Sequence, residues 1–208
     1  MQVYEGREGI GPLFFAYNRC VARVLPQTFF DRPALVVARA LLGKALVRRK
    51  GDRTYTGVIT EVEAYDGPQD RACHAHRGKT PRNEPMFGPA GHWYVYFVYG
   101  MHWMLNIVTG RRGYPAAILI RGIRAPDESQ YWNGPAKLTK AFQIDRQLNG
   151  KGASRREGLW IEDRGVRVNI RDVRRTPRIG VAYAGIWAKK PYRFVWNPGK
   201  RTSQRFFT

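Results

Sequence analysis

The chain has 208 residues, 43% of them hydrophobic and 13% aromatic, a composition that supports a folded core and excludes a disordered chain. Its 36 Lys and Arg residues outnumber its 16 Asp and Glu residues, so that the formal net charge is +20. No apolar run approaches the roughly 18 residues of a membrane span, and the N-terminal residues lack the pattern of a secretory signal.

The first predicted elements are an N-terminal extension and a short helix. Residues 1–26 have the pattern of a loosely packed lead-in, and one domain is expected over residues 27–208. A helix is predicted within residues 31–44, because Asp31 can cap its start and Gly43 can end it.

The later segments are mostly strands and turns. In chain order they are predicted as a hairpin over 44–65 turning at Gly51 and Asp52, a strand–turn–strand unit over 92–108 with Gly100 near its turn, an apolar strand over 116–123, a helix over 134–150 and a half-buried strand over 166–173. We expect a single α+β domain with a curved, mostly antiparallel sheet, flanking helices and a protruding β-hairpin.

The positive charge indicates a polyanionic partner. It is heaviest in residues 150–208, and such an excess destabilises a compact chain through self-repulsion. Nucleic acid is the leading candidate, because neutralising phosphates releases counterions and supplies affinity without sequence preference. An anionic membrane surface is the rival, but no long basic amphipathic helix supports it. A generally basic surface is the third interpretation.

Acidic residues are clustered in one stretch, TEVEAYDGPQDRACHAH, residues 60–76. Alternate side chains of a strand share a face, so Glu61 and Glu63 would project together, about 7 Å apart at the backbone. That spacing suits a carboxylate pair that cleaves a glycosidic bond, although a solvated or arginine-paired strand face is the commoner explanation. The strand breaks after Asp66, so Glu63 is the better placed to meet a ligand. Strict alternation would add Ile59 and Tyr65 to this face and put Val58, Thr60, Val62 and Ala64 on the other.

Histidines and cysteines give no metal pattern. His74 and His76 stand beside Cys73 without the CxxC or HExxH spacing that holds zinc. We expect no metal and no other cofactor, and a histidine that hydrogen-bonds a substrate or packs in a loop is the better interpretation. Two cysteines, Cys20 and Cys73, are too few for a disulfide framework and indicate reduced thiols inside a cell.

Aromatic residues crowd the second predicted hairpin. Half of them are expected in the core, but the tip also carries Tyr99 and Met101. In a basic protein an exposed wedge at a hairpin tip can enter the base stack of a duplex. Tyrosines farther down can sandwich an extruded base, more strongly if that base is cationic. The aromatic residues are Trp93, Tyr94, Tyr96, Phe97, Tyr99 and Trp103.

Six blocks follow one another over about residues 27–196: VITEVEAYDGPQDRACHA, TPRNEPMF, YVYFVYGMHWMLNIV, LIRGIRA, GPAKL and PRIGVAYAGIWAKKPYRF. Together they resemble the 3-methyladenine (alkyladenine) DNA glycosylase family. The resemblance implies a monofunctional base-excision enzyme without lyase activity. Such an enzyme flips an alkylated or deaminated purine, such as 3-methyladenine, 7-methylguanine, hypoxanthine or ethenoadenine, from duplex DNA and hydrolyses its N-glycosidic bond.

The resemblance also assigns roles to particular residues. Glu63 matches the general base that orients and deprotonates the attacking water, and Arg121 matches the arginine that helps hold that water. Asn106 matches the residue that crowds the exocyclic amine of normal guanine. The other matches are Tyr65, His74 and Tyr96 around the base pocket, Tyr99 in the gap left by the flipped nucleotide with Met101 beside it, and Thr80 and Arg82 at the DNA interface.

Some expectations stay open at this point. The loop HAHRGKTPRN is one residue shorter than the family form, which leaves His76, Arg77 and Lys79 without an assigned contact. A bound water and His74 are equally suited to protonate a neutral purine as it leaves. The expected protein is a monomer that acts on double-stranded DNA, not on a membrane, in a prokaryotic cytoplasm with the nucleoid or in a eukaryotic nucleus.

Two other functions fit part of the pattern. A non-catalytic nucleic-acid-binding module needs the charge and the aromatic residues but leaves the EVEAY acid without a purpose. A carboxylate-dependent nucleoside or glycoside hydrolase uses the acid but leaves the +20 charge without one.

Overall fold

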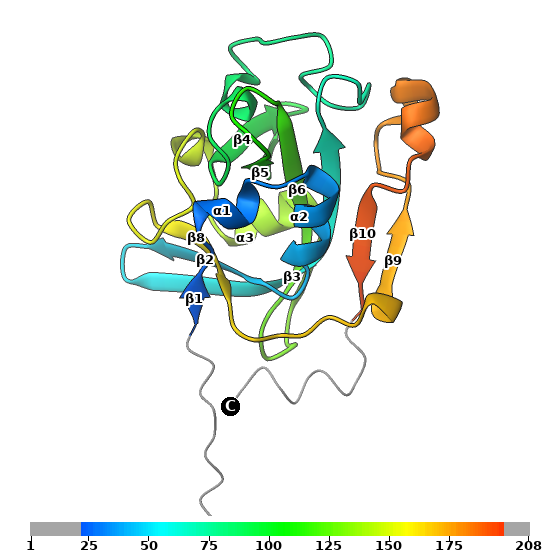
Figure 1. Cartoon of the computed structure of the whole chain (residues 1–208). Helices are drawn as coiled ribbons and strands as arrows, with labels where there is room; N and C mark the ends of the chain where they lie inside the picture. The colour runs from blue at the N-terminus through cyan, green and yellow to red at the C-terminus, as the bar shows by residue number, and fades with distance from the viewer. Residues whose placement is uncertain (1–21, 198–208) are drawn as a thin grey trace, which may run out of the picture.

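The computed structural model describes residues 22–197 (Figure 1). The end of the expected N-terminal extension joins the sheet, because β1 (Arg23–Val24) pairs with β8 (Leu159–Asp163) and Leu25 is buried in the core. The division of the chain at residue 27 stays a prediction. The expectations that lie outside the described residues concern residues 1–21, Cys20 and residues 198–208.

Strand β3 (Arg53–Asp66) organises the sheet, because other strands pair along both of its edges. β2 (Ala45–Lys50) pairs with its first half, through the predicted turn at Gly51 and Asp52. β10 (Arg193–Trp196) pairs with its second half, and β6 (Ala116–Arg124) pairs with residues 58–66. Partners therefore reach the acidic stretch from two directions.

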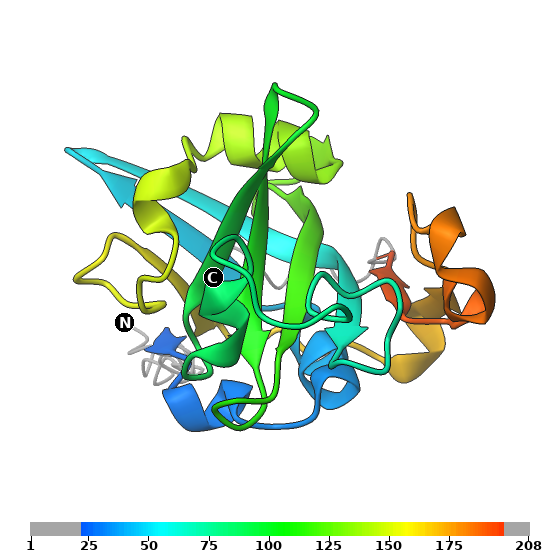
Figure 2. The same cartoon turned by 90° about the horizontal axis from the view of Figure 1, so that it is seen from above.

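The sheet follows the order β1-β8-β2-β3-β6-β5-β4, with β7 on β6 and β9 on β10. Every pair is antiparallel, and the twist of the long strands curls the sheet (Figure 2). The β4–β5 hairpin projects from it, as Figure 2 shows. The expected α+β domain with a curved antiparallel sheet is confirmed. The remaining strands are β4 (Trp93–Val98), β5 (His102–Thr109), β7 (Tyr131–Asn133) and β9 (Val173–Thr176).

Three short α-helices flank the sheet: α1 (Gln27–Phe30), α2 (Ala34–Leu41) and α3 (Pro135–Ala141). α2 confirms the first predicted helix. The second is shorter than predicted, because the backbone leaves helical geometry after Phe142 and Asp145 caps a separate 3₁₀ turn by accepting from the Gln147 N–H. None of the helices within residues 22–197 is long and apolar enough to cross a membrane. The 3₁₀ turns are Glu84–Phe87, Arg146–Leu148, Ile170–Asp172 and Ala182–Lys189.

Residues 166–173 do not form the predicted strand. Residues 166–169 lack a strand partner, and β9 begins only at Val173. Val166 and Val168 do pack against the core, beside Gly43. Their alternation with polar residues therefore reflects burial of one side of the segment. A strand shows the same alternation, but it also needs a neighbouring strand for hydrogen bonding.

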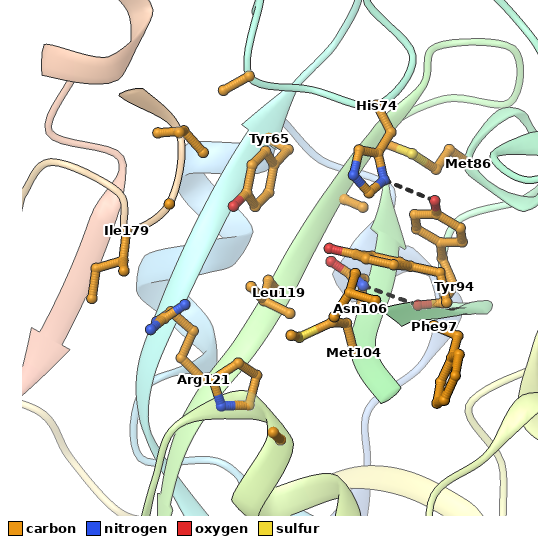
Figure 3. A pocket seen from close by; sticks show the side chains of 18 of the residues that line it. Tyr65, His74, Met86, Tyr94, Phe97, Met104, Asn106, Leu119, Arg121 and Ile179 are labelled. Atoms are coloured by element: carbon orange, nitrogen blue, oxygen red, sulfur yellow. Dashed lines mark hydrogen bonds between the residues drawn. The ribbon is translucent and has the colours of Figure 1, made fainter. Parts of the chain in front are cut away.

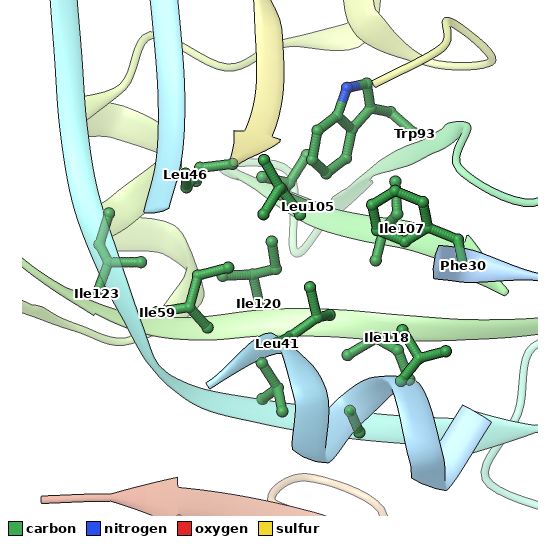
Figure 4. Packing of buried hydrophobic residues seen from close by; sticks show 14 of the residues in the cluster. Phe30, Leu41, Leu46, Ile59, Trp93, Leu105, Ile107, Ile118, Ile120 and Ile123 are labelled. Atoms are coloured by element: carbon green, nitrogen blue, oxygen red, sulfur yellow. The ribbon is translucent and has the colours of Figure 1, made fainter. Parts of the chain in front are cut away.

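The central strands present alternate residues to two faces. One face packs under α2 and forms the main hydrophobic core (Figure 4). Its members include Ile59, Leu105, Ile107, Ile118 and Ile120, all essentially inaccessible to solvent. The opposite face lines a cavity with Tyr94, Tyr96, Met104, Asn106, Leu119 and Arg121. The same period of two thus builds the core on one side and the cavity on the other.

A bulge in β3 changes which residues face the core. The register with β6 shifts between Ile59 and Val62, and Thr60 has no partner on β6. Ile59 is fully buried in the same cluster as Val62, so it does not share a face with Glu61 and Glu63 as strict alternation predicted. A bulge inserts one residue and re-aims the side chains that follow it.

The tip of the β4–β5 hairpin is a two-residue turn closed by a 3.1 Å hydrogen bond from the Met101 N–H to the Val98 carbonyl. Tyr99 and Gly100 both have positive φ, 52° and 66°, which is typical of a type I′ turn. A bulky side chain rarely adopts this conformation. Tyr99 is nevertheless 84% exposed, so packing does not compensate for the backbone strain.

Candidate active site

A cavity of about 600 Å³ opens on the sheet face opposite the core (Figure 3). Strands β3, β4, β5 and β6 form its floor, and residues 179–183 form part of its rim. The volume lies within the usual range for pockets that enclose a small organic molecule. Of the residues singled out in the sequence, the cavity collects Tyr65, His74, Arg82, Tyr96, Tyr99, Asn106 and Arg121.

Glu63 lies directly under this floor and has no solvent-exposed surface. The Tyr65 hydroxyl donates to its Oε2 at 2.9 Å, and the Ile179 N–H donates to its Oε1 at 2.8 Å. The Nε of Arg121 stands 3.4 Å from Oε1. Tyr65, Ile179 and Arg121 all line the cavity, so the carboxylate is one residue away from whatever the cavity binds.

Burial raises the pKa of Glu63 above its ordinary value. The charge of Arg121 and the hydrogen bonds from Ile179 and Tyr65 lower the pKa, but they offset only part of the desolvation, and the nearby Glu61 raises it further. Sequence reasoning expected Arg121 to favour the ionised form, which it does, but burial is the larger effect. A carboxylate held in this way is a stronger proton acceptor than an exposed one.

Glu61 has a different environment, although it lies two residues away on the same strand. Its Oε1 accepts from the Nε of Arg121 at 2.9 Å and from the Nε of Arg193 at 2.7 Å. Its side chain is 3% exposed, and it does not line the cavity. The two carboxylates therefore do not form a pair with space for a water between them, which removes the support for a paired-carboxylate glycosidase.

Three rings form one wall of the cavity. His74 Nδ1 lies 2.9 Å from the Tyr94 hydroxyl (Figure 3). The His74 ring meets the Tyr96 ring edge-on, with 4.6 Å between the ring centres. Burial, with a contribution from the charge of Arg82, lowers the pKa of His74, which keeps the imidazole neutral at pH 7. The Arg82 guanidinium lies 5.3 Å from the Tyr96 ring centre and so places a positive charge against the aromatic wall.

Asn106 faces these rings from β5. Its Nδ2 donates to the Tyr94 carbonyl at 3.1 Å, which fixes the orientation of the amide. The amide oxygen is turned toward the cavity (Figure 3). The side chain is 3% exposed, so it is a rigid polar group at the base of an otherwise aromatic and aliphatic wall.

A buried ion pair anchors the rim. Arg178 donates from Nη2 to Asp70 Oδ1 at 2.8 Å and from Nη1 to Asp70 Oδ2, and neither side chain has exposed surface. Nη1 also donates to the Ala64 carbonyl at 2.8 Å, and the guanidinium lies 4.8 Å from the Tyr65 ring centre. Because Arg178 precedes Ile179, this pair holds the N–H group that contacts Glu63.

Comparisons with known proteins agree with this geometry. Residues 28–200 match the model of the family described as Methylpurine-DNA glycosylase (MPG). The chain belongs to the methylpurine-DNA glycosylase family. It is therefore a DNA glycosylase, an enzyme of DNA repair, as the six sequence blocks predicted.

Curated relatives support this family assignment over most of the chain. A protein of Methanocella arvoryzae is 44% identical over 185 residues, 82% of this chain and 91% of its own. A protein of Myxococcus xanthus is 46% identical over 175 residues, 83% of this chain and 89% of its own. A protein of Carboxydothermus hydrogenoformans is 42% identical over 195 residues, 88% of this chain and 100% of its own. Each carries the name "Putative 3-methyladenine DNA glycosylase".

Two residues with expected DNA contacts lie outside the cavity of this glycosylase. Met101 is 66% exposed and lines a separate groove of about 560 Å³ between the hairpin and α3, together with Trp103 and Lys137. Thr80 belongs to the loop before the Glu84–Phe87 turn, where its N–H donates to Asn83 Oδ1 at 2.7 Å. Arg82, from the same sequence block, reaches the cavity instead.

Sequence reasoning missed several groups that shape the site. Asp70, Arg178, Ile179 and Arg193 all lie in blocks that carry the family resemblance, but nothing local marks them as neighbours of Glu63. Ile179 acts through its backbone N–H, which no side-chain pattern reveals. Tyr94 was counted only among the aromatic residues, and its hydroxyl contact with His74 depends on the strand register.

Proposed function

We propose that this glycosylase flips alkylated or deaminated purines of the 3-methyladenine, 7-methylguanine, hypoxanthine and ethenoadenine class out of duplex DNA and hydrolyses their N-glycosidic bond. The observation that carries the proposal is Glu63, a single carboxylate without exposed surface beneath an aromatic cavity. Its raised pKa suits a general base, and its two hydrogen-bond donors hold its orientation.

In the proposed reaction Glu63 takes a proton from a water whose oxygen attacks the deoxyribose C1′. A carboxylate can accept about four hydrogen bonds. Tyr65 and Ile179 each donate one to Glu63, whereas Arg121 stands at ion-pair distance without a hydrogen bond to it. The acceptor position that faces Arg121 is left for the water. The bond from C1′ to the purine nitrogen breaks with its electron pair on the base, and the sugar keeps the water-derived hydroxyl.

Protonation of the leaving base depends on the lesion. An alkylated purine already carries a positive charge and leaves as a neutral molecule, so it needs no proton. A neutral purine such as hypoxanthine must gain one at a ring nitrogen. Because the pKa of His74 is lowered, its ring is neutral and holds no spare proton, which favours a bound water as the proton source.

The walls of the cavity supply recognition in this proposal. Tyr96 and His74 contact the flipped base, and the rings attract a cationic lesion more strongly than a neutral base. The fixed amide of Asn106 crowds the exocyclic amine of normal guanine. Tyr65, with its hydroxyl on Glu63, closes the cavity from the β3 side.

The hairpin and the surrounding charge bind the duplex in the same proposal. Tyr99 fills the gap left by the flipped nucleotide, Met101 lies against the neighbouring base pair, and Thr80 and Arg82 contact the DNA near the cavity. Flipping costs a few kcal/mol and is cheapest at damaged or mispaired bases, which contributes to selectivity. We propose that a monomer is sufficient, because all of these groups come from one chain.

Glu63→Gln tests the proposal. The amide keeps the size of the side chain but cannot accept a proton, so the single-turnover rate of base release should fall about 10²- to 10⁴-fold. Affinity for lesion-containing duplex should stay within a few-fold of the unmodified protein. Excision is measured on methylated duplex DNA by alkaline cleavage at the abasic sites formed.

The outcomes of these assays and of two further measurements separate the alternatives. Undiminished base release by Glu63→Gln would remove Glu63 from the mechanism, and DNA binding without any base loss would indicate a non-catalytic module. Turnover of free nucleosides would indicate the nucleoside hydrolase. Capture of an enzyme–DNA adduct by borohydride would require an amine nucleophile in place of water.

A further inference from the structure

Glu61 is held more firmly than its neighbour Glu63. Its Oε1 accepts from two guanidinium groups, Arg121 at 2.9 Å and Arg193 at 2.7 Å. Arg193 is itself oriented, because its Nη1 donates to Thr176 Oγ1 at 3.2 Å. Charge-assisted hydrogen bonds of this length are about twice as strong as neutral ones. Glu61 is therefore the primary partner of Arg121, although Arg121 also lines the cavity.

The contacts of Arg121 show a competition between the two glutamates. Its Nε carries a single proton and lies 2.9 Å from Glu61 Oε1 but 3.4 Å from Glu63 Oε1. The shorter contact is a hydrogen bond, whereas the longer one is only an ion pair. Without Glu61, the same proton would be free to bond to Glu63.

The backbone is shaped to accommodate Glu61. The bulge in β3 lies next to it, and Gly122 stands opposite it on β6. A Cβ atom at Gly122 would lie 2.9 Å from the Cβ of Glu61, closer than side-chain carbons pack. A bulge and a glycine at the same point let two buried glutamates follow each other along one strand, which simple ion pairing at the surface would not require.

We propose that Glu61 is a positioning residue that binds Arg121 and so prevents it from forming a full hydrogen bond with Glu63. Glu63 then keeps an acceptor position for the attacking water, while Arg121 stays at the cavity. The inference rests on the proposed role of Glu63 and adds the reason why a second buried glutamate and a second arginine accompany it.

The charges around Glu63 determine how it responds to substitution. Glu61 and Glu63 supply two negative charges, and Arg121 and Arg193 supply two positive ones. Removing the charge of Glu61 turns Arg121 toward Glu63, whereas removing Arg193 leaves Glu61 to bind Arg121 more strongly. The groups that face Glu63 or its partners are Glu61 and Tyr65 of β3, Tyr96 of β4, Arg121 of β6, Arg193 of β10 and, in the segment after β9, Arg178.

The two substitutions should therefore have opposite effects on the pH dependence of excision. In Glu61→Gln, Arg121 bonds to Glu63, so the acidic limb of the single-turnover rate moves to lower pH by about one unit. The plateau rate falls about 10- to 100-fold, because the hydrogen bond from Arg121 weakens Glu63 as a base and displaces the attacking water. In Arg193→Met the acidic limb moves to higher pH, and the plateau rate stays within about threefold.

Glu162→Gln is the matched control. Glu162 is also a buried glutamate, with a side chain 4% exposed, and it accepts from Trp160 Nε1 at 2.7 Å and from Arg164 Nε at 2.8 Å. It lies on β8, away from the cavity. This variant should lose stability as Glu61→Gln does, but its pH–rate profile should match that of the unmodified protein. Thermal unfolding and lesion-duplex binding are measured for all three variants.

The outcomes are distinct from those that test Glu63 itself. If Glu63→Gln abolishes excision while Glu61→Gln keeps the plateau rate and the acidic limb of the unmodified protein, Glu61 has no positioning role. If both profiles shift in the same direction, the competition for Arg121 is wrong. Should Glu61→Gln fail to fold, the upward shift in Arg193→Met decides, and its absence overturns the inference.

Discussion

The floor of the cavity and the tip of the β4–β5 hairpin differ in almost every physical respect. At the floor, Glu63 and Asp70 have no exposed surface, and each is oriented by charged or polar donors from distant parts of the chain. At the tip, Tyr99 is 84% exposed on a backbone with φ of 52° and has no hydrogen-bond partner for its side chain among the described residues. The side chains of the floor are therefore buried and fixed by several partners, whereas the tip has a strained backbone and an exposed side chain.

This difference indicates how the glycosylase divides its work. Fixed charges in a site shielded from water act strongly on a reaction, because they need no reorganisation. An exposed ring on a tight turn contributes only where another molecule covers it. Changes at the floor should therefore alter the rate of base release or the stability of the fold, and changes at the tip should alter the engagement of duplex DNA.

The largest effect on stability is expected from Asp70→Asn, at the floor. It leaves the Arg178 guanidinium buried without a countercharge, which should lower the free energy of unfolding by about 3–5 kcal/mol. Because Arg178 holds Ile179 against Glu63, base release should slow as well. Chemical denaturation and single-turnover excision measure the two effects.

A partly exposed ion pair provides the control for Asp70→Asn. Lys44 and Asp163 lie 2.7 Å apart, but the side chain of Asp163 is 41% exposed. Asp163→Asn should change the free energy of unfolding by less than about 1 kcal/mol. Equal losses of unfolding free energy in the two variants would show that burial does not account for the contribution of the Asp70–Arg178 pair to stability.

A change of pH is expected to have an intermediate effect, on the excision rate. Burial raises the pKa of Glu63 above 4.5. Glu63 should therefore become protonated, and stop acting as a base, at a higher pH than an exposed glutamate. Below that raised pKa the excision rate of a cationic lesion should fall about tenfold per pH unit. Single-turnover rates from pH 9 down to the lowest pH at which the protein stays folded measure this limb, and the absence of any fall over that range would contradict the role of Glu63.

The titration of Glu63 should affect stability in the opposite direction to activity: protonation of Glu63 stops excision but stabilises the fold. A carboxyl with a higher pKa in the folded state binds its proton more tightly when folded. Its contribution to stability is therefore fully present below pH 4.5 and declines as pH rises through the raised pKa. In Glu63→Gln this part of the pH dependence of unfolding should disappear.

The smallest effect on stability is expected at the hairpin tip, from Tyr99→Asn. Asparagine tolerates positive φ at the first position of a type I′ turn, so the free energy of unfolding should rise by about 1 kcal/mol. The wedge is lost, so excision from duplex DNA should slow about tenfold at low protein concentration. A fluorescent base analogue in the duplex reports the reduced extrusion directly.

Tyr99→Phe separates the ring from the turn. It keeps the aromatic wedge and the strained backbone, so extrusion should remain near that of the unmodified protein. If Tyr99→Asn extruded the analogue as well as Tyr99→Phe did, the tip would have no part in base flipping, and the contrast between tip and floor would fail.

Much of the fold follows from patterns that are local in the sequence. The hairpin turns at Gly51 and Gly100, the strand predicted over 116–123 and the helix before Gly43 were all predicted correctly, because a period of two, an apolar run or a capping residue is visible within a short window. The failed strand at 166–173 and the shortened helix after Pro135 depend on partners outside such a window.

The site divides in the same way. The sequence by itself determined which residue types are present: the acid of EVEAY, the aromatic hairpin and the arginines of the six blocks. It did not determine that Ile59 turns to the core at a bulge while Glu61 and Glu63 remain together. That outcome depends on pairing between β3 and β6, which lie far apart in the chain.

Only the tertiary structure decided which donors surround each carboxylate of this stretch. Asp70, Glu61 and Glu63 are acids of one short stretch; strand position and the family resemblance favoured Glu63, but neither predicted the donors of the three carboxylates. Arg178 neutralises the first, Arg121 and Arg193 hold the second, and the third receives a backbone N–H, a hydroxyl and a longer ion pair. The reactivity of a buried carboxylate depends on its donors, and these arrive from strands and loops that only folding brings together.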